Sequence, residues 1–254
     1  MTEPARAMMA SLPMYDWPEV RAETDRYWQA IRAALGHGPD GLTRGFEDHM
    51  AHWQRPDLLL SQTCGMPYRS RLHDKVALVG TPDFGVAGCA PGFYCSVLVV
   101  NAQDDRAQLS DFADDLFAYN EGGSQSGWAA PASHVAPLGR RFTRLLATGS
   151  HRASLCAVAE GRAAMAAIDA VTWALALRHD PAAARLRELE RTAPTPGLPY
   201  ITAQGHDPAP LRAAITAAIA GLDDTTRAAL MLRGLVAIPA RAYLAVPTPP
   251  PPQG

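Results

Sequence analysis

Residues 116–135 read LFAYNEGGSQSGWAAPASHV: a short apolar run, a glycine-rich turn and an alanine-rich segment. The apolar run at 116–120 predicts a buried β-strand, and the alanine-rich segment favours a helix. The turn EGGSQSG places small hydroxyl side chains and backbone N–H groups at a helix entrance, where an anion can accept hydrogen bonds. This stretch predicts an α/β protein and is the most chemically suggestive part of the chain.

The same alternation of apolar runs and helical patterns extends in both directions. Towards the N-terminus it predicts strands at 10–14, 57–62, 76–80 and 94–101, and a helix with one apolar face from Pro18 to Leu35. Towards the C-terminus it predicts a strand at 165–171 and helices at 152–162, 173–190, 211–219 and 225–235. Prolines predict an extended connection at 192–202 and a disordered tail at 247–254. Such alternation is typical of a mainly parallel sheet.

Composition excludes several classes of protein. The 254 residues have a formal net charge of −2 and scattered basic side chains, so we expect no nucleic-acid partner. No apolar stretch approaches the length of a transmembrane helix. Residues 1–17 lack the apolar core of a signal peptide, which predicts a cytoplasmic protein if the chain is full-length and a periplasmic one if a signal was removed.

The four cysteines are Cys64, Cys89, Cys95 and Cys156. They show no CxxC spacing, so we expect no metal site and no cofactor. Cys89 and Cys95 could pair in an oxidising compartment, although free thiols are the favoured interpretation. The segment SQTCG lacks a nucleophile-elbow pattern and an identifiable histidine partner, so it gives no support to a hydrolase.

Four segments in order resemble the phosphate/phosphite/phosphonate substrate-binding family of ABC transporters: DLLLSQTCGMPY (57–68), GFYCSVLVVN (92–101), YNEGGSQSGWAAP (119–131) and TGSHRASLCAVAEGRAAMAAIDAVTWAL (148–175). The resemblance covers about residues 11–246. It implies a type II periplasmic-binding fold, with two lobes of mainly parallel sheet flanked by helices and joined by two crossover segments. Lobe 1 would comprise 1–95 and 200–254, lobe 2 would comprise 96–199, and a ligand cleft would lie between them.

The resemblance also implies a set of ligand-binding residues. An oxyanion would be held at the turn formed by Ser124, Gln125, Ser126 and Gly127, with His151 reaching the ligand and Asp169 tuning selectivity. Further contacts would come from Tyr15, Ser61, Gln62, Thr63, Tyr68 and Tyr94. Two positions depart from the family pattern: Gln125 stands where a threonine is frequent, and Ala164 stands where a further aspartate is common.

These observations favour a solute-binding protein that captures a phosphate- or phosphonate-like oxyanion, closes around a hinge and presents the ligand to an ABC-transporter permease. Two alternatives use the same fold. One is a cytoplasmic ligand sensor or carrier. The other is an enzyme resembling those of the menaquinone pathway, in which Asp169 and His151 would be the candidate acid and base. We expect a binding protein rather than an enzyme, with no assigned catalytic residue.

Overall fold

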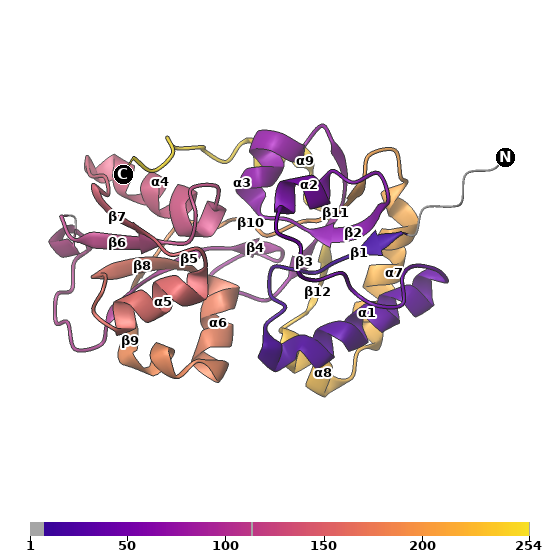
Figure 1. Ribbon diagram of the computed structural model, residues 1–254, viewed down its shortest axis with the longest axis horizontal. Helices are drawn as coiled ribbons and strands as arrows, with labels where there is room; N and C mark the ends of the chain where they lie inside the picture. The colour runs from indigo at the N-terminus through magenta and orange to yellow at the C-terminus, as the bar shows by residue number, and fades with distance from the viewer. Residues whose placement is uncertain (1–7, 113, 254) are drawn as a thin grey trace. The chain divides into compact units, whose positions relative to one another are not determined.

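The computed structural model describes residues 8–112 and 114–253, which form two compact units (Figure 1). Unit 1 contains the described residues up to Gly85 together with Pro196–Tyr243, and unit 2 contains Val86–Thr195 together with the segment from Leu244 onwards. These boundaries differ from the expected ones at 95/96 and 199/200. The segment after Tyr243 also groups with unit 2, whereas it was expected to belong to lobe 1.

Unit 1 is built on a five-stranded sheet with the order β1-β2-β11-β3-β12. Its strands are β1 (Met9–Ala10), β2 (Leu58–Gln62), β3 (Val76–Asp83), β11 (Tyr200–Ala203) and β12 (Gly234–Val236). β1 is parallel to β2, while β11 is antiparallel to both β2 and β3, and β12 is antiparallel to β3. β11 follows the point where the chain re-enters unit 1, and it inserts between two strands that run the opposite way. The sheet is therefore mixed.

Two helices supply nearly half of the buried residues of the unit 1 core cluster. They are α1 (Arg21–Leu35) and α7 (Pro208–Gly221), which pack on each other and on the sheet. Trp28 and Ile31 from α1 meet Ile215 from α7 and Leu60 from β2 in one apolar cluster. The remaining helical segments of this unit are a 3-10 turn (Pro18–Val20), α2 (His49–Trp53), α3 (Gly65–Pro67), a π-helix (Tyr68–Leu72) and α8 (Asp224–Leu230). Helix α9 (Ala240–Leu244) ends at the unit boundary.

Unit 2 has a second five-stranded sheet, with the order β7-β6-β8-β5-β9. Its strands are β5 (Ser96–Asn101), β6 (Leu116–Tyr119), β7 (Arg144–Ala147), β8 (Met165–Asp169) and β9 (Leu186–Arg191). β6 is parallel to β7 and β8, and β5 is antiparallel to β8 and β9. Most strands of this sheet thus run the same way, with the entering strand β5 reversed. The expectation of a mainly parallel sheet missed this reversed strand.

Helices cover both faces of the unit 2 sheet (Figure 1). A π-helix (Gln125–Ala129) continues into α4 (Ala130–Val135) on one face, and α5 (His151–Ala159) and α6 (Ala170–His179) lie on the other. Short 3-10 turns occur at Leu109–Phe112, Ala136–Leu138 and Pro181–Arg185. A separate two-stranded ladder joins β4 (Phe93–Tyr94) to β10 (Thr195–Pro196). Trp128 of the π-helix and Val135 of α4 belong to the same apolar cluster as Phe117 of β6.

Three expected elements are wrong, for identifiable reasons. The helix expected over 173–190 ends at His179, because Asp180 accepts a hydrogen bond from the N–H of Ala182 and Pro181 starts a new turn. Residues 186–191 then form β9. The helix expected to reach 235 ends at Leu230, where Met231 adopts a left-handed conformation with φ of 55°. The first strand is limited to Met9–Ala10 instead of covering 10–14.

The described residues contain no helix long and apolar enough to cross a membrane, and no group of three or more metal-ligating side chains. Residues 1–7, on which the expectation about a signal peptide partly rests, lie outside the described residues. All four cysteines are free thiols. Burial raises the pKa of Cys95 to about 12, and its side chain forms a hydrogen bond with that of Cys89.

Candidate functional site

The glycine-rich turn adopts the expected strand-turn-helix geometry. It follows β6 and leads into the π-helix at Gln125. Ser124 is the N-cap: its Oγ accepts a hydrogen bond from the N–H of Gly127 at 2.9 Å. Ser124, Gln125 and Ser126 are all almost fully buried. Since a serine Oγ can accept and donate at once, the cap leaves the Ser124 O–H available as a donor.

His151 joins this turn from the first residue of α5. Its Nε2 lies 2.8 Å from the Oγ of Ser126, and its Nδ1 lies 3.2 Å from the carbonyl oxygen of Ala167. A carbonyl oxygen only accepts, so Nδ1 carries the proton and donates to it. Nε2 then presents a lone pair, and the Ser126 hydroxyl donates to it. The structure thus brings His151, from the TGSH segment, into contact with the turn.

The protonation of His151 follows from its surroundings. Burial lowers the pKa of His151 to about 4, and the hydrogen bond to the carbonyl of Ala167 opposes this effect without cancelling it. The ring is therefore neutral at pH 7. The unit 2 turn consequently offers hydroxyl groups, backbone amides and a neutral imidazole to a ligand.

Gly127 closes the turn against Asn120, the residue that follows β6. A Cβ atom at position 127 would lie 1.8 Å from Asn120 Oδ1 and 3.3 Å from His151 Cε1, so only glycine fits there without rearrangement. Among the described residues, Asn120 Oδ1 is a buried acceptor without a hydrogen-bond partner. Burying an acceptor without a partner costs about 1–3 kcal/mol.

Asp169 is the last residue of β8 and the N-cap of α6. Its Oδ1 accepts hydrogen bonds from the N–H groups of Val171 and Thr172, at 2.8 and 3.0 Å. Ser96, its partner across the β5–β8 ladder, donates from Oγ to the carbonyl oxygen of Ser126 at 2.8 Å. Asp169 is thus paired across the sheet with Ser96, which contacts the turn Ser124–Gly127, called the serine turn below. Part of the hydrogen-bonding capacity of Asp169 is used for capping.

Tyr94, also predicted as a ligand contact, lies in β4, and its side chain is buried. Tyr94 lies two residues before Ser96, whose hydroxyl contacts the serine turn. The unit 2 members of the predicted site therefore come from β4, the serine turn, the start of α5 and the end of β8.

Three of the unit 1 candidates, Ser61, Gln62 and Thr63, lie at the end of β2. Ser61 Oγ lies 2.8 Å from Ser11 Oγ, which in turn lies 2.8 Å from His52 Nε2. Gln62 donates from Nε2 to the carbonyl of Leu198 at 3.2 Å, and the N–H of Thr63 donates to the carbonyl of Pro199 at 3.1 Å.

The Ser61 network also contains a histidine that sequence reasoning did not identify. His52 reaches Ser61 only through Ser11, and burial lowers the pKa of His52 to about 4, aided by the positive charge of Arg55. Its ring stacks on Phe46 with centroids 3.8 Å apart. A neutral, buried and stacked imidazole that is one hydroxyl removed from Ser61 is suited to hold the end of β2 rather than to activate Ser61.

The two unit 1 tyrosines differ in their surroundings. The ring of Tyr68 is 1% exposed and packs edge-on against Tyr243, with centroids 5.1 Å apart. Burial raises the pKa of Tyr68 to about 12, so its phenol stays protonated. Tyr15 keeps more exposure and packs edge-on against Phe84. These contacts fix both rings within unit 1.

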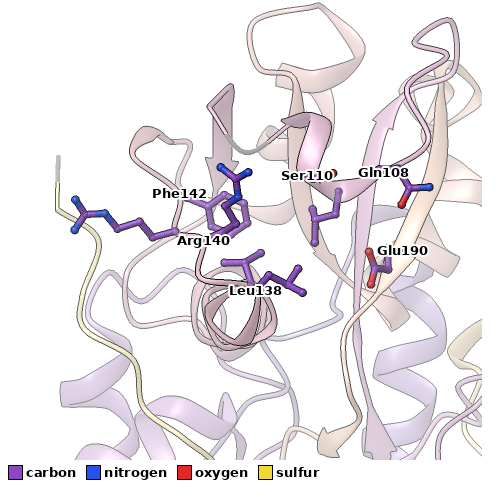
Figure 2. A pocket seen from close by; sticks show the side chains of 9 residues that line it. Gln108, Ser110, Leu138, Arg140, Phe142 and Glu190 are labelled. Carbon is purple, nitrogen blue, oxygen red and sulfur yellow. The ribbon is translucent and has the colours of Figure 1, made fainter.

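A hollow of about 460 Å³ on unit 2 lies apart from these residues (Figure 2). Its lining includes Leu138, Arg140 and Phe142 on one side and Gln108 and Glu190 on the other, and none of the predicted site residues belongs to it. Glu190 Oε1 also lies 2.8 Å from His134 Nε2. The hollow is thus a separate surface feature.

Sequence reasoning missed Ser96 and Asn120, which both contact the serine turn. A signal for each was present, since Ser96 is a polar residue at the start of an apolar strand and Asn120 ends another strand directly before the turn. Ser96 reaches a partner 30 positions away, and the approach of Asn120 to Gly127 depends on how the turn folds back, so spacing alone reveals neither contact.

Comparison with protein families gives a match over residues 61–240 to the family described as "ABC transporter, phosphonate, periplasmic substrate-binding protein". That range includes the serine turn, His151 and Asp169. A sequence search of curated proteins found no match.

Solved structures share the fold at low sequence identity. PhnD1 from Prochlorococcus marinus (MIT 9301), in complex with methylphosphonate, superposes with a TM-score of 0.72 at 16% identity, covering 93% of this chain and 94% of that one. A binding protein component of an ABC phosphonate transporter from Pseudomonas aeruginosa gives 0.66 at 17% identity, covering 91% and 81%. A histidine kinase sensor domain with similarity to periplasmic binding proteins gives 0.60 at 14% identity, covering 91% and 97%. The periplasmic-binding fold is therefore confirmed.

Proposed function

The chain belongs to the phosphonate periplasmic substrate-binding protein family of ABC transporters, and from this premise we propose that it captures a small phosphonate- or phosphate-like oxyanion at its serine turn. The family consists of substrate-binding proteins rather than enzymes, so the reading as an enzyme of the menaquinone type is not supported. The turn Ser124–Gly127 and His151 form the unit 2 part of the proposed site.

The observation that carries the proposal is the contact between Ser126 Oγ and His151 Nε2 at the helix entrance. In the free protein the Ser126 hydroxyl donates to the imidazole. A tetrahedral oxyanion, with a full negative charge, is a stronger acceptor than a neutral imidazole, so the hydroxyl is expected to turn to the anion. Ser124 and the first-turn amides add further donors without introducing a positive charge.

We extend the proposal to the residues expected in the other half of the site. Tyr15, Ser61, Gln62, Thr63 and Tyr68 in unit 1 would contact the ligand from the opposite side of an interlobe cleft, with Tyr94 and Asp169 completing the unit 2 side. Asp169 would select ligands that carry a proton or an ammonium group, because a carboxylate accepts hydrogen bonds from both.

In this proposal the protein delivers its ligand to an ABC-transporter permease from the periplasm, which is the compartment named for the family. Closure of the two units around the ligand would present one liganded form to the permease. Small-angle X-ray scattering should show a smaller radius of gyration when saturating methylphosphonate is added.

The test is isothermal calorimetry with methylphosphonate, phosphate, phosphite, sulfate and acetate, preceded by a thermal-shift screen of the same compounds. Binding of a phosphorus oxyanion is expected, and Ser126→Ala should weaken it by about 1–3 kcal/mol through loss of a hydrogen bond to a charged group. Ser110→Ala is the matched control, since this exposed unit 2 serine lies outside the serine turn.

Two results would contradict the proposal. If no phosphorus oxyanion binds, the proposed ligand class is wrong. Equal affinities in wild type and Ser126→Ala would remove the serine turn from the site, even if a ligand were found.

A further inference from the structure

The proline-rich segment (residues 247–253) packs on unit 2 instead of forming the disordered tail expected from its composition. The indole Nε1 of Trp128 donates a hydrogen bond to the carbonyl oxygen of Pro250 at 2.9 Å. Only 6% of Trp128 is exposed. In Figure 1 this segment is the yellow stretch that runs beside α4.

The segment contacts the chain on both sides of the serine turn. A Cβ atom at Gly122 would lie 2.9 Å from Pro252 Cδ, so the backbone before the turn touches one proline. Trp128, directly after the turn, touches another through the hydrogen bond to Pro250. A hollow of about 400 Å³ between the segment and α4 is lined by residues that include Trp128, Ala132, Phe142 and Pro249–Pro251.

The chemistry of the contact suits a bound rather than a loose segment. Proline fixes φ and removes the backbone donor, so a run of prolines loses little entropy on docking and presents only carbonyl acceptors. An indole N–H beside an aromatic face is the usual partner for such a segment. Trp128, which lies in the π-helix Gln125–Ala129, supplies both the indole N–H donor and the aromatic face.

A π-helix is rare because its geometry is less favourable than that of an α-helix, and it persists where surrounding contacts hold it. The π-helix of unit 2 contains Gln125, Ser126 and Gly127, which are three of the proposed ligand contacts. The proline-rich segment therefore contacts the helical turn whose conformation sets the direction of the Ser126 hydroxyl.

We propose that the proline-rich segment is a strap that holds the serine turn in its ligand-binding conformation, with Trp128 as the positioning residue. This inference rests on the proposed function, because the turn is the proposed oxyanion site. The strap contributes no group to the ligand, and it acts through Trp128 and Gly122.

The experiment compares the full chain with a chain that stops at Val246, using calorimetry with methylphosphonate. Loss of one hydrogen bond and its packing is expected to weaken binding about two- to tenfold. A synthetic peptide of sequence TPPPPQG, added at saturating concentration, should restore the affinity of the shortened chain. Equal affinities of the two chains, or a shortened chain that the peptide does not rescue, would overturn the proposal.

Trp128→Phe removes the indole donor and keeps an aromatic ring, so it should weaken methylphosphonate binding in the full chain and abolish rescue in the shortened one. Trp28→Phe is the matched control, because Trp28 also donates from its indole to a proline carbonyl, that of Pro39, but lies in unit 1. If Trp28→Phe lowers the affinity for methylphosphonate as much as Trp128→Phe does, the strap proposal is contradicted.

Hydrogen exchange separates failure of the strap from failure of the proposed function, because it requires no ligand. In the shortened chain, amides of residues 124–129 should exchange faster, and the peptide should slow them again. Unchanged exchange would overturn the strap even if methylphosphonate binds. Faster exchange that the peptide reverses, in a chain that binds no oxyanion, would keep the structural role of the strap and reject its role in binding.

Discussion

At the scale of single residues, the candidate site depends on a neutral histidine. His151 donates from Nδ1 to a carbonyl and accepts at Nε2 from Ser126, an arrangement that requires one proton on the ring. Protonation would give Nε2 a hydrogen and reverse its bond with Ser126. The Ser126 oxygen would then accept from the imidazolium, and its hydrogen would be free to turn elsewhere.

The pKa of His151 gives a prediction with a definite sign. An unfolded histidine titrates near 6.5, whereas burial holds His151 near 4 in the folded chain. Between these values the unfolded state binds the extra proton, so this residue destabilises the fold as pH falls from about 6.5 towards 4. Within this range the free energy of unfolding changes by up to about 1.4 kcal/mol per pH unit, because one proton is bound.

An NMR titration of the histidine Cε1–H resonances measures this pKa, and the spectrum of His151→Gln assigns the resonance. A pKa of 6 or above for His151 would show that the ring is not held neutral as the geometry requires.

Gly127 provides the second prediction at this scale. Gly127→Ala should destabilise unit 2 by about 1–3 kcal/mol, because the new methyl group would overlap Asn120 Oδ1. Gly123→Ala is the control, since a Cβ there meets nothing within 4 Å. Urea unfolding of the two variants checks this prediction, and equal stabilities would show that the turn rearranges at little cost.

At the scale of secondary-structure elements, Asp169 joins β8 to α6, and an observed capping role can be separated from its proposed role towards a ligand. Its capping role is visible in the hydrogen bonds from Val171 and Thr172. Its role towards a ligand is a proposal that depends on its charge. A neutral side chain of the same shape can cap a helix without supplying that charge.

Asp169→Ala should therefore cost about 0.5–2 kcal/mol of stability through loss of the cap, while Asp169→Asn should cost clearly less. If the carboxylate also selects the ligand, Asp169→Asn should change the ranking of phosphonates with and without an amino group. Thermal unfolding gives the first result and calorimetry the second. Equal destabilisation by both substitutions would contradict the capping interpretation.

At the scale of the whole molecule, each unit has its own apolar core, and the chain passes between the units more than once. Leu60 belongs to the unit 1 cluster, whereas Phe117 belongs to the unit 2 cluster and stacks on Phe142 with centroids 3.9 Å apart. Separate cores are expected to lose stability separately when one is damaged.

Truncation of each core tests this independence. Leu60→Ala should lower stability by about 2–5 kcal/mol and Phe117→Ala by about 3–5 kcal/mol. Hydrogen exchange read segment by segment should show faster exchange mainly within the damaged unit, and each variant serves as the control for the other. Equal acceleration throughout both units would show that they unfold as one cooperative body.

The sequence by itself determined the strands β2, β3, β5, β6 and β8, where α1 ends, and which turn carries the serine hydroxyls. These features depend on apolar periodicity, prolines and glycines, which act over a few neighbouring residues. The family resemblance, carried by four short segments, extended this to the correct fold, and it named both the serine turn and His151 as candidate ligand contacts.

Only the tertiary structure decided the features that depend on distant partners. Residues 186–191 form a strand because β5 offers them an edge to pair with, although their local pattern favoured a helix. Ser96 enters the site through its hydrogen bond to the carbonyl of Ser126, and Asn120 enters it through the folded turn that brings Gly127 against its side chain. The proline-rich segment is ordered because Trp128, more than a hundred positions earlier, supplies the donor that its own backbone cannot. Local propensity describes what a segment prefers when alone, and these segments are decided by hydrogen bonds and packing that exist only after folding.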